Sequence, residues 1–258
     1  MYNINFIKRC FKNLESKNIF YKYFNERKTY RDLKRYYLKF KSLIKSERLK
    51  IVTFSDKTFE MYASVVSIFF SNNIWVPLSS SLPTERLIEI LKNSKINIIL
   101  IENTSKLLND KKLKKFIKFS KIKIISYSEI NNHKADKDNF EIPKFDFHSM
   151  SMIYFTSGST GSPKGVCITY NNFISCFKSK NEILYKNKKK LIFGDYHDPS
   201  FVISLVILFP CIYLGSIISP SRNLYETLNP IAHLKKNKIN VLITVPSTIN
   251  RVKELYPS

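Results

Sequence analysis

Glycine is scarce in this chain, and most of it lies in one short stretch. Three of the five glycines among 258 residues fall within eight positions, inside the segment TSGSTGSPKG that runs from Thr156 to Gly165. Glycine permits a positive φ and lets a ligand approach the backbone closely. Successive peptide N–H groups in such a turn form a concavity that binds anions. Hydroxyl side chains and a lysine between the glycines add donors and a compact positive charge suited to phosphate.

The segment is therefore predicted to be a polyphosphate-binding loop. The residues predicted to bind the ligand are Thr156, Ser157, Gly158, Ser159, Thr160, Gly161, Lys164 and Gly165. The spacing GxxGxxKG is not that of the common P-loop, which reads GxxxxGK[ST] at a helix N-terminus. A flexible Ser/Gly turn between two strands is the structural alternative. Such turns rarely combine glycines, hydroxyl side chains and a lysine within ten residues.

The elements around the loop must hold it in place. A predicted strand, residues 152–156, leads into the loop, and another, residues 165–169, follows it. Other short runs rich in Ile, Val and aromatic residues predict buried strands; they are 50–55, 74–78, 96–102, 121–128, 216–220 and 239–245. Helical spacing at 58–70, 83–94 and 103–119 alternates with them. Strand–helix alternation predicts an α/β fold with mostly parallel sheets flanked by helices. The polar stretch 129–149 is predicted to be a surface loop.

The charge of the chain is strongly positive, with 43 basic and 20 acidic residues and a net charge of +23. Such a charge is typical of proteins that bind nucleic acid or anionic membranes. Only eight of the basic residues are arginines, however, and arginine is the usual reader of base edges. The lysines are also spread over the whole chain, as a biased genome composition would produce. We therefore do not expect nucleic acid as a partner, although the charge would attract an anionic substrate.

The cysteines and the apolar segments point to a cytoplasmic protein. Cys10, Cys167, Cys176 and Cys211 form no CxxC pair and have no histidine at metal-ligand spacing, so reduced thiols without zinc are expected.

Residues 201–218 carry no charge and are long enough for a membrane span. A proline and a glycine interrupt that run, and we predict a buried helix to about residue 214 followed by a buried strand. The N-terminal residues lack the uninterrupted apolar core of a signal peptide. No membrane partner is expected.

The loop sequence closely resembles the signature of one enzyme family. Thr156 to Gly165 matches the pattern [ST]SG[ST][ST]GxPKG of the adenylate-forming (AMP-forming) ligases without a departure. That family includes amino-acid adenylation domains, acyl-CoA synthetases and luciferase-like enzymes. WVPLSSSLPTERL (75–87) resembles its VPLDPxxPxERL segment, with Ser79 in place of Asp, and INVLITVPSTINRV (239–252) resembles the strand and turn that line its acyl pocket. The resemblance runs from about residue 20 to the last residue.

The resemblance implies a reaction in two steps. A small carboxylate attacks the α-phosphate of ATP, giving an acyl-adenylate and pyrophosphate, and a thiol on CoA or on a phosphopantetheine carrier protein then takes the acyl group. It implies ATP and Mg²⁺ as cofactors, with the Mg²⁺ ligands not identified in this chain. It gives Lys164 and the loop N–H groups the role of stabilising charge on the phosphates during transfer.

The resemblance also places a substrate pocket, with one departure. In amino-acid-activating relatives an Asp in an F-D-x-S segment holds the substrate ammonium. Counting back from Gly215 puts Phe201 at the Phe and Val202 at the Asp, and valine cannot pair with an ammonium. His197 and Asp198, just upstream, are the candidate substitutes. The substrate is therefore expected to lack an α-ammonium or to be held by Asp198; a simple turn role for Asp198 is the alternative.

Motifs that follow in the family are not found in this sequence. They are the GxTE segment, the ribose-binding Asp, the hinge and the C-terminal domain with its catalytic lysine. We therefore expect residues 1–258 to be the N-terminal part of the large AMP-binding domain. The chain is expected to be truncated or split, and in the split case another chain is expected to supply the C-terminal half. The alternatives are a non-catalytic nucleotide- or partner-binding remnant and, with less support, a basic nucleic-acid-binding protein.

Overall fold

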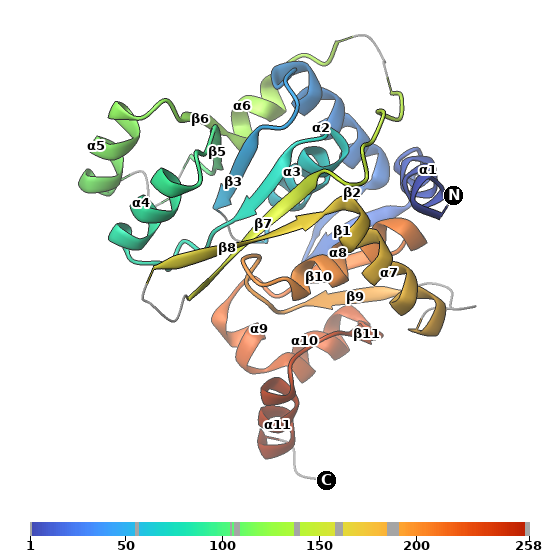
Figure 1. The fold of residues 1–258 in the computed structure, drawn as a ribbon. Helices are drawn as coiled ribbons and strands as arrows, with labels where there is room; N and C mark the ends of the chain where they lie inside the picture. Colours follow the sequence, from blue (N-terminus) through green and yellow to red (C-terminus); the bar gives the residue numbers. More distant parts are fainter. Residues whose placement is uncertain are drawn as a thin grey trace. The chain divides into compact units, whose positions relative to one another are not determined.

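The polypeptide forms two compact units in the computed structural model, which describes residues 2–54, 57–103, 105, 109–136, 140–157, 162–184 and 191–255. The first unit comprises Met1–Leu33 and Ser175–Ser258, and the second comprises Lys34–Ile174. Each unit contains one sheet with helices packed on it (Figure 1). The predicted α/β class is confirmed.

The second unit is built on a six-stranded sheet in the order β6-β5-β3-β4-β7-β8. Every neighbouring pair in it is parallel except β7 and β8, which form an antiparallel hairpin. The strands are β3 (Lys50–Phe54), β4 (Ile74–Pro77), β5 (Ile98–Ile101), β6 (Lys123–Ser126), β7 (Met150–Ser157) and β8 (Pro163–Thr169). The helices that begin and end within this unit are α3 (Phe59–Phe70), α4 (Thr84–Asn93), α5 (Lys111–Phe119) and α6 (Tyr127–Asn132).

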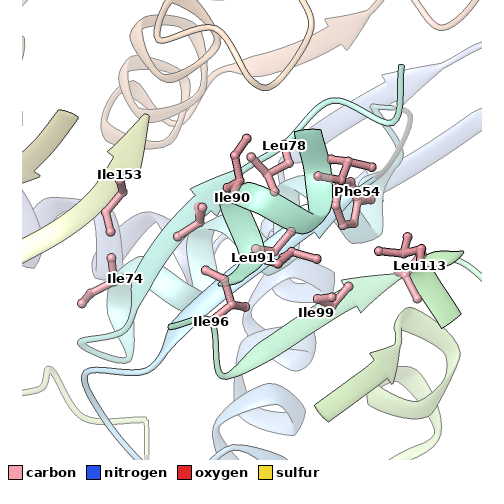
Figure 2. Close-up of a cluster of buried hydrophobic side chains, with 13 residues drawn as sticks. Phe54, Ile74, Leu78, Ile90, Leu91, Ile96, Ile99, Leu113 and Ile153 are labelled. Carbon is pink, nitrogen blue, oxygen red and sulfur yellow. The ribbon is translucent and has the colours of Figure 1, made fainter. Parts of the chain in front are cut away.

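The core on one face of this sheet follows the two-residue period of its strands. Val52 and Phe54 of β3, for example, point to the same face and are buried with Val76 of β4. Helix α4 covers that face with residues at helical spacing, including Ile90 and Leu91. Figure 2 shows these helix side chains gathered with residues of the sheet. Helix α3 packs on β3 and β4 but contributes nothing to this cluster, so it covers the opposite face.

The first unit is built on a five-stranded sheet in the order β11-β9-β10-β1-β2. Only β1 and β2 pair antiparallel; the other neighbours are parallel. The strands are β1 (Ile19–Tyr23), β2 (Glu26–Thr29), β9 (Ile192–Asp195), β10 (Ile217–Pro220) and β11 (Val241–Leu242). Its helices are α1 (Tyr2–Leu14), α8 (Ile203–Leu214), α9 (Leu224–Leu228), α10 (Pro230–Asn237) and α11 (Pro246–Leu255). Two further helices, α2 (Tyr30–Leu43) and α7 (Tyr170–Leu184), cross the boundary between the units.

The uncharged run 201–218 forms a buried helix followed by a strand, as predicted. Helix α8 is buried along most of its length and ends at Gly215, whose φ of 65° is the left-handed conformation that glycine adopts without strain. Strand β10 starts two residues later. Within the part of the chain that the structure describes, no helix is long and apolar enough to cross a membrane.

Several element boundaries differ from those predicted. Helix α5 begins at Lys111 rather than near residue 103, because the Asp110 carboxylate accepts the N–H groups of Lys112 and Leu113 at 2.9 Å and caps the helix there. The strand predicted over 121–128 ends at Ser126, which caps helix α6, so the predicted loop 129–149 starts as helix. The β1–β2 hairpin was not predicted, since its turn carries no Asn-Gly or Asp-Gly signal.

A buried tyrosine holds three parts of the first unit together, and its removal gives a test of that packing. The Tyr30 hydroxyl lies 2.7 Å from the Ser216 carbonyl oxygen and 2.9 Å from the Cys211 carbonyl oxygen. Tyr30→Phe should lower the free energy of unfolding by about 1 to 2 kcal/mol, because the change deletes a buried donor and keeps the ring. Tyr225→Phe is the matched control, since Tyr225 is exposed. Denaturant unfolding in which both variants matched the parent chain would contradict this role.

Candidate functional site

The predicted phosphate loop lies at the tip of the β7–β8 hairpin. The register of the hairpin pairs Thr156 with Lys164 and Ser157 with Pro163, so the last described residues on either side of the loop are held together. The Thr156 hydroxyl lies 3.5 Å from the Lys164 carbonyl oxygen. Gly158, Ser159, Thr160 and Gly161 lie outside the described residues. The backbone pairing therefore places a hydroxyl and an ammonium-bearing side chain opposite each other at the mouth of the loop.

The base of the hairpin is fixed in the core of the second unit. Residues 151–154 of β7 are buried, and Met152 pairs with Trp75 of β4. The Trp75 indole N–H donates to the Thr53 hydroxyl at 2.9 Å, and its ring meets Tyr154 edge-on at 6.0 Å between centroids. Toward the tip the burial ends, and Thr156 and Lys164 are exposed. The hairpin thus has a buried base in the core and an exposed end next to the loop.

Gly165 has a packing role in addition to the ligand-binding role predicted for it. Gly165 pairs with Phe155 across the hairpin. A Cβ added at this position would lie 3.0 Å from the Cγ2 atom of Ile153 and 3.3 Å from the Phe155 ring. Both distances are tighter than ordinary contacts, so the Phe155 ring occupies the space that a side chain would need. The close approach of β7 therefore accounts for this glycine without any ligand.

The residues predicted to form the substrate pocket lie in the turn between β9 and α8 of the first unit. The His197 N–H donates to the Asp195 carboxylate at 3.2 Å. The Asp198 carboxylate accepts the Ser200 N–H at 2.8 Å, an Asx turn that starts the path into the helix. Phe201 and Val202 come next, with 64% and 52% of their surfaces exposed. The structure thus brings all four residues into one turn after the carboxyl end of a parallel strand, where ligands bind in α/β sheets.

Two interactions beside this turn were not predicted from the sequence. Asp195, the last residue of β9, is completely buried, and its backbone oxygen accepts the Ser221 N–H at 2.8 Å. The Tyr196 hydroxyl lies 2.7 Å from Nδ1 of the buried His233. Burial raises the pKa of the Tyr196 hydroxyl, which therefore stays protonated at neutral pH. A carboxylate that ends an apolar strand is the sequence signal that could have identified Asp195.

The described residues do not offer a magnesium or zinc site. Among them, no three His, Cys, Asp or Glu side chains come together in a way that could hold a metal ion. Cys10 and Cys211 are buried and Cys167 and Cys176 are exposed, all as free thiols. Hydroxyl and ammonium groups at the mouth of the loop suit phosphate oxygens, whereas Mg²⁺ prefers carboxylate ligands. The described residues next to the loop thus carry groups suited to phosphate, and no metal-dependent step is assigned to them.

Comparison with known proteins gives a consistent result over almost the whole chain. The family model described as AMP-binding enzyme matches residues 9–258. The chain is 30% identical over 160 residues to a D-alanine–D-alanyl carrier protein ligase of Streptococcus pyogenes, covering 58% of this chain and 28% of that protein. It is 22% identical over 206 residues to surfactin synthase subunit 1 of Bacillus subtilis, covering 79% of this chain and 6% of that protein.

Solved structures show the same fold. The Vibrio cholerae adenylation domain AlmE, in complex with glycyl-adenosine-5′-phosphate, superposes with a TM-score of 0.82 at 15% identity, covering 97% of this chain and 51% of that one. The o-succinylbenzoate CoA synthetase MenE of Bacillus subtilis, in complex with AMP, gives a TM-score of 0.80 at 17% identity, covering 98% of this chain and 65% of that one. The chain spans about half the length of AlmE and a smaller share of the curated relatives named above.

Two variants of Asp198 separate its turn role from its charge. Asp198→Ala removes the oxygen that accepts the Ser200 N–H and should lower the free energy of unfolding by about 1 kcal/mol. Asp198→Asn keeps that acceptor and should unfold like the parent chain. Thermal or denaturant unfolding measures the difference. Equal stability of the alanine variant and the parent would show that the turn does not depend on this side chain.

Proposed function

This chain belongs to the AMP-binding enzyme family, and on that premise we propose that it takes part in ATP-dependent activation of a small carboxylate as an acyl-adenylate. The observation that carries the proposal is the β7–β8 hairpin, which holds Thr156 opposite Lys164 at the mouth of the loop TSGSTGSPKG. The solved relatives that share the fold include proteins bound to AMP and to an aminoacyl-adenylate. Because the chain matches only part of each relative, the reaction of the complete protein is a proposal throughout.

In the proposed reaction an oxygen of the carboxylate attacks the α-phosphorus of ATP. A bond forms between that oxygen and phosphorus, the bond from phosphorus to the oxygen bridging to the β-phosphate breaks, and pyrophosphate leaves with the electron pair. The negative charge on the leaving group grows as this bond breaks. A lysine ammonium and a hydroxyl held next to the phosphates stabilise that charge, and they stabilise it more in the transition state than in bound ATP. This is the role that we propose for Lys164 and Thr156.

The turn between β9 and α8 supports a substrate without an α-ammonium group. Val202 is apolar and more than half exposed, so it offers no charge to an ammonium. One oxygen of the Asp198 carboxylate is already used in the Asx turn. We therefore propose an acyl acid as the substrate, with an amino acid held by Asp198 as the alternative. Asp198→Asn discriminates between them, because it preserves the turn and removes only the charge: an unchanged KM for the substrate removes Asp198 from its recognition.

The acceptor of the acyl group is proposed to be a thiol, on CoA or on a carrier protein. Relatives of both kinds match the chain, since one is a CoA synthetase and another is a carrier protein ligase. The chain covers 51% of the AlmE chain and 50% of one MenE chain, so about half of each lies outside the matched part. We propose that residues 1–258 are the N-terminal part of the large domain and that full turnover needs such further segments, on the same or another polypeptide. A chain that binds ATP without forming an adenylate is the second candidate.

Replacement of Lys164 tests the proposed function directly. Lys164→Ala should weaken ATP binding at least about tenfold, because a charge-assisted hydrogen bond to phosphate contributes about 1.5 to 3 kcal/mol. Lys164→Arg should retain part of the affinity. Lys92→Ala is the matched control, since Lys92 is an exposed lysine on helix α4. Isothermal titration with ATP gives the affinities.

Carboxylate-dependent ATP–pyrophosphate exchange, measured on the same variants in the presence of the further segments, separates the two candidate functions. Exchange that Lys164→Ala abolishes supports the enzyme. ATP binding without exchange for any acid in a panel of acyl and amino acids supports the binding protein. An ATP affinity that does not change in Lys164→Ala would overturn the assignment of the loop.

A further inference from the structure

Lysines are concentrated in one segment of the second unit. Residues 111–123 include seven lysines in 13 positions and no acidic residue, whereas the whole chain has 43 basic residues in 258. The local density of positive charge is thus about three times that of the chain. Lys112 is engaged by Glu85, with 2.6 Å between ammonium and carboxylate. The remaining exposed lysines of helix α5 form what we call the lysine face; they are Lys111, Lys114, Lys115 and Lys118.

The lysine face is held outward by the packing of α5. On the other side of this helix Leu113 is buried, and Phe116 and Ile117 pack against the same core cluster as helix α4. Figure 1 shows α5 beside α4 in the second unit, and Figure 2 shows Leu113 within the cluster. The Asp110 carboxylate caps the helix and also accepts the Thr84 hydroxyl. These bonds lower the pKa of the Asp110 carboxyl, with the Thr84 bond contributing most, so the cap is charged at neutral pH.

An aromatic side chain is exposed at the end of the same helix. Phe119, the last residue of α5, has 79% of its surface exposed. Moving an exposed aromatic ring from water to an apolar boundary lowers the free energy. The surface therefore combines fixed positive charge with an exposed aromatic side chain.

Two simpler explanations do not account for this surface. Lysine on an edge strand discourages pairing with other chains, which explains Lys123 but not the lysines of α5. A composition bias toward lysine explains why lysines occur along the whole chain, but not why their density is about three times higher over residues 111–123. Binding to nucleic acid is disfavoured because residues 111–123 contain no arginine, which base recognition prefers.

We propose that the lysine face docks the protein reversibly on an anionic membrane surface. The ammonium groups would lie against anionic lipid headgroups, and Phe119 would insert at the boundary between headgroups and acyl chains. The apolar side of α5 stays in the protein core, so the contact is electrostatic with one aromatic anchor. This proposal departs from the expectation, stated above from the sequence, that the protein has no membrane partner. It does not depend on the proposed ligase function.

Cosedimentation with vesicles tests the proposal. The full chain should bind vesicles of phosphatidylcholine with phosphatidylserine, fail to bind phosphatidylcholine alone, and dissociate as salt rises. In the variant Lys114→Glu/Lys115→Glu/Lys118→Glu the partition coefficient for the vesicles should fall about 100-fold or more, because each lysine near an anionic surface raises it about fivefold. Lys8→Glu/Lys12→Glu/Lys17→Glu is the matched control, with the same change in net charge at exposed lysines of the first unit. It should keep most of the binding.

A second variant reports the contact without removing it. Phe119→Trp places an indole at an exposed position, while the native Trp75 is buried. Its emission should shift to shorter wavelength with phosphatidylserine vesicles and stay unchanged with phosphatidylcholine. Equal losses in the two triple variants would show that net charge alone attracts the protein and would overturn the proposal. Absence of vesicle binding by the parent chain would also overturn the proposal. If the parent chain bound an oligonucleotide but no vesicles, and only the α5 variant lost that binding, nucleic acid would be the partner instead.

Discussion

The pairing of β7 with a neighbour on each side is the constraint on which the candidate site depends. On one side β7 runs parallel to the buried strand β4, and on the other it forms an antiparallel hairpin with β8. The side chains of a strand alternate between faces, so a slip by one residue would turn every side chain of β7 to the wrong face of the sheet. The buried residues 151–154 prevent that slip. The same register then sets Thr156 opposite Lys164, which means that core packing positions residues that are themselves exposed.

Positive charge has different consequences in different parts of the molecule. Lys164 lies next to a loop with glycines and hydroxyl groups, and we propose that it binds a single phosphate chain. Lys112 is paired with Glu85. The lysine face is an extended array on one side of helix α5, an arrangement suited to a surface rather than to a small ligand. The net charge of +23 by itself would not distinguish these cases.

The turn after β9 combines a structural role with the binding role that we propose for it. The Asp198 carboxylate starts the turn into α8, and the buried Asp195 carboxylate accepts an N–H group from the same turn. A turn fixed by its own carboxylates presents Phe201 and Val202 outward without help from a ligand. Such a preorganised edge loses little conformational entropy when a substrate binds. Its apolar end is the physical reason for favouring a substrate without an ammonium group.

The sequence by itself determined features that depend on neighbouring residues. The glycine and hydroxyl spacing of residues 156–165 identified the loop and the family, and Gly215 predicted the end of α8, because both depend on local backbone geometry. Tertiary structure alone decided what depends on distant residues. The packing of Phe155 over Gly165, the burial of Asp195 and the outward direction of the lysines on α5 each require neighbours brought from another strand or helix. The same is true of β1, which lies beside β10 through a pairing of Tyr21 with Ile218 that no local pattern encodes.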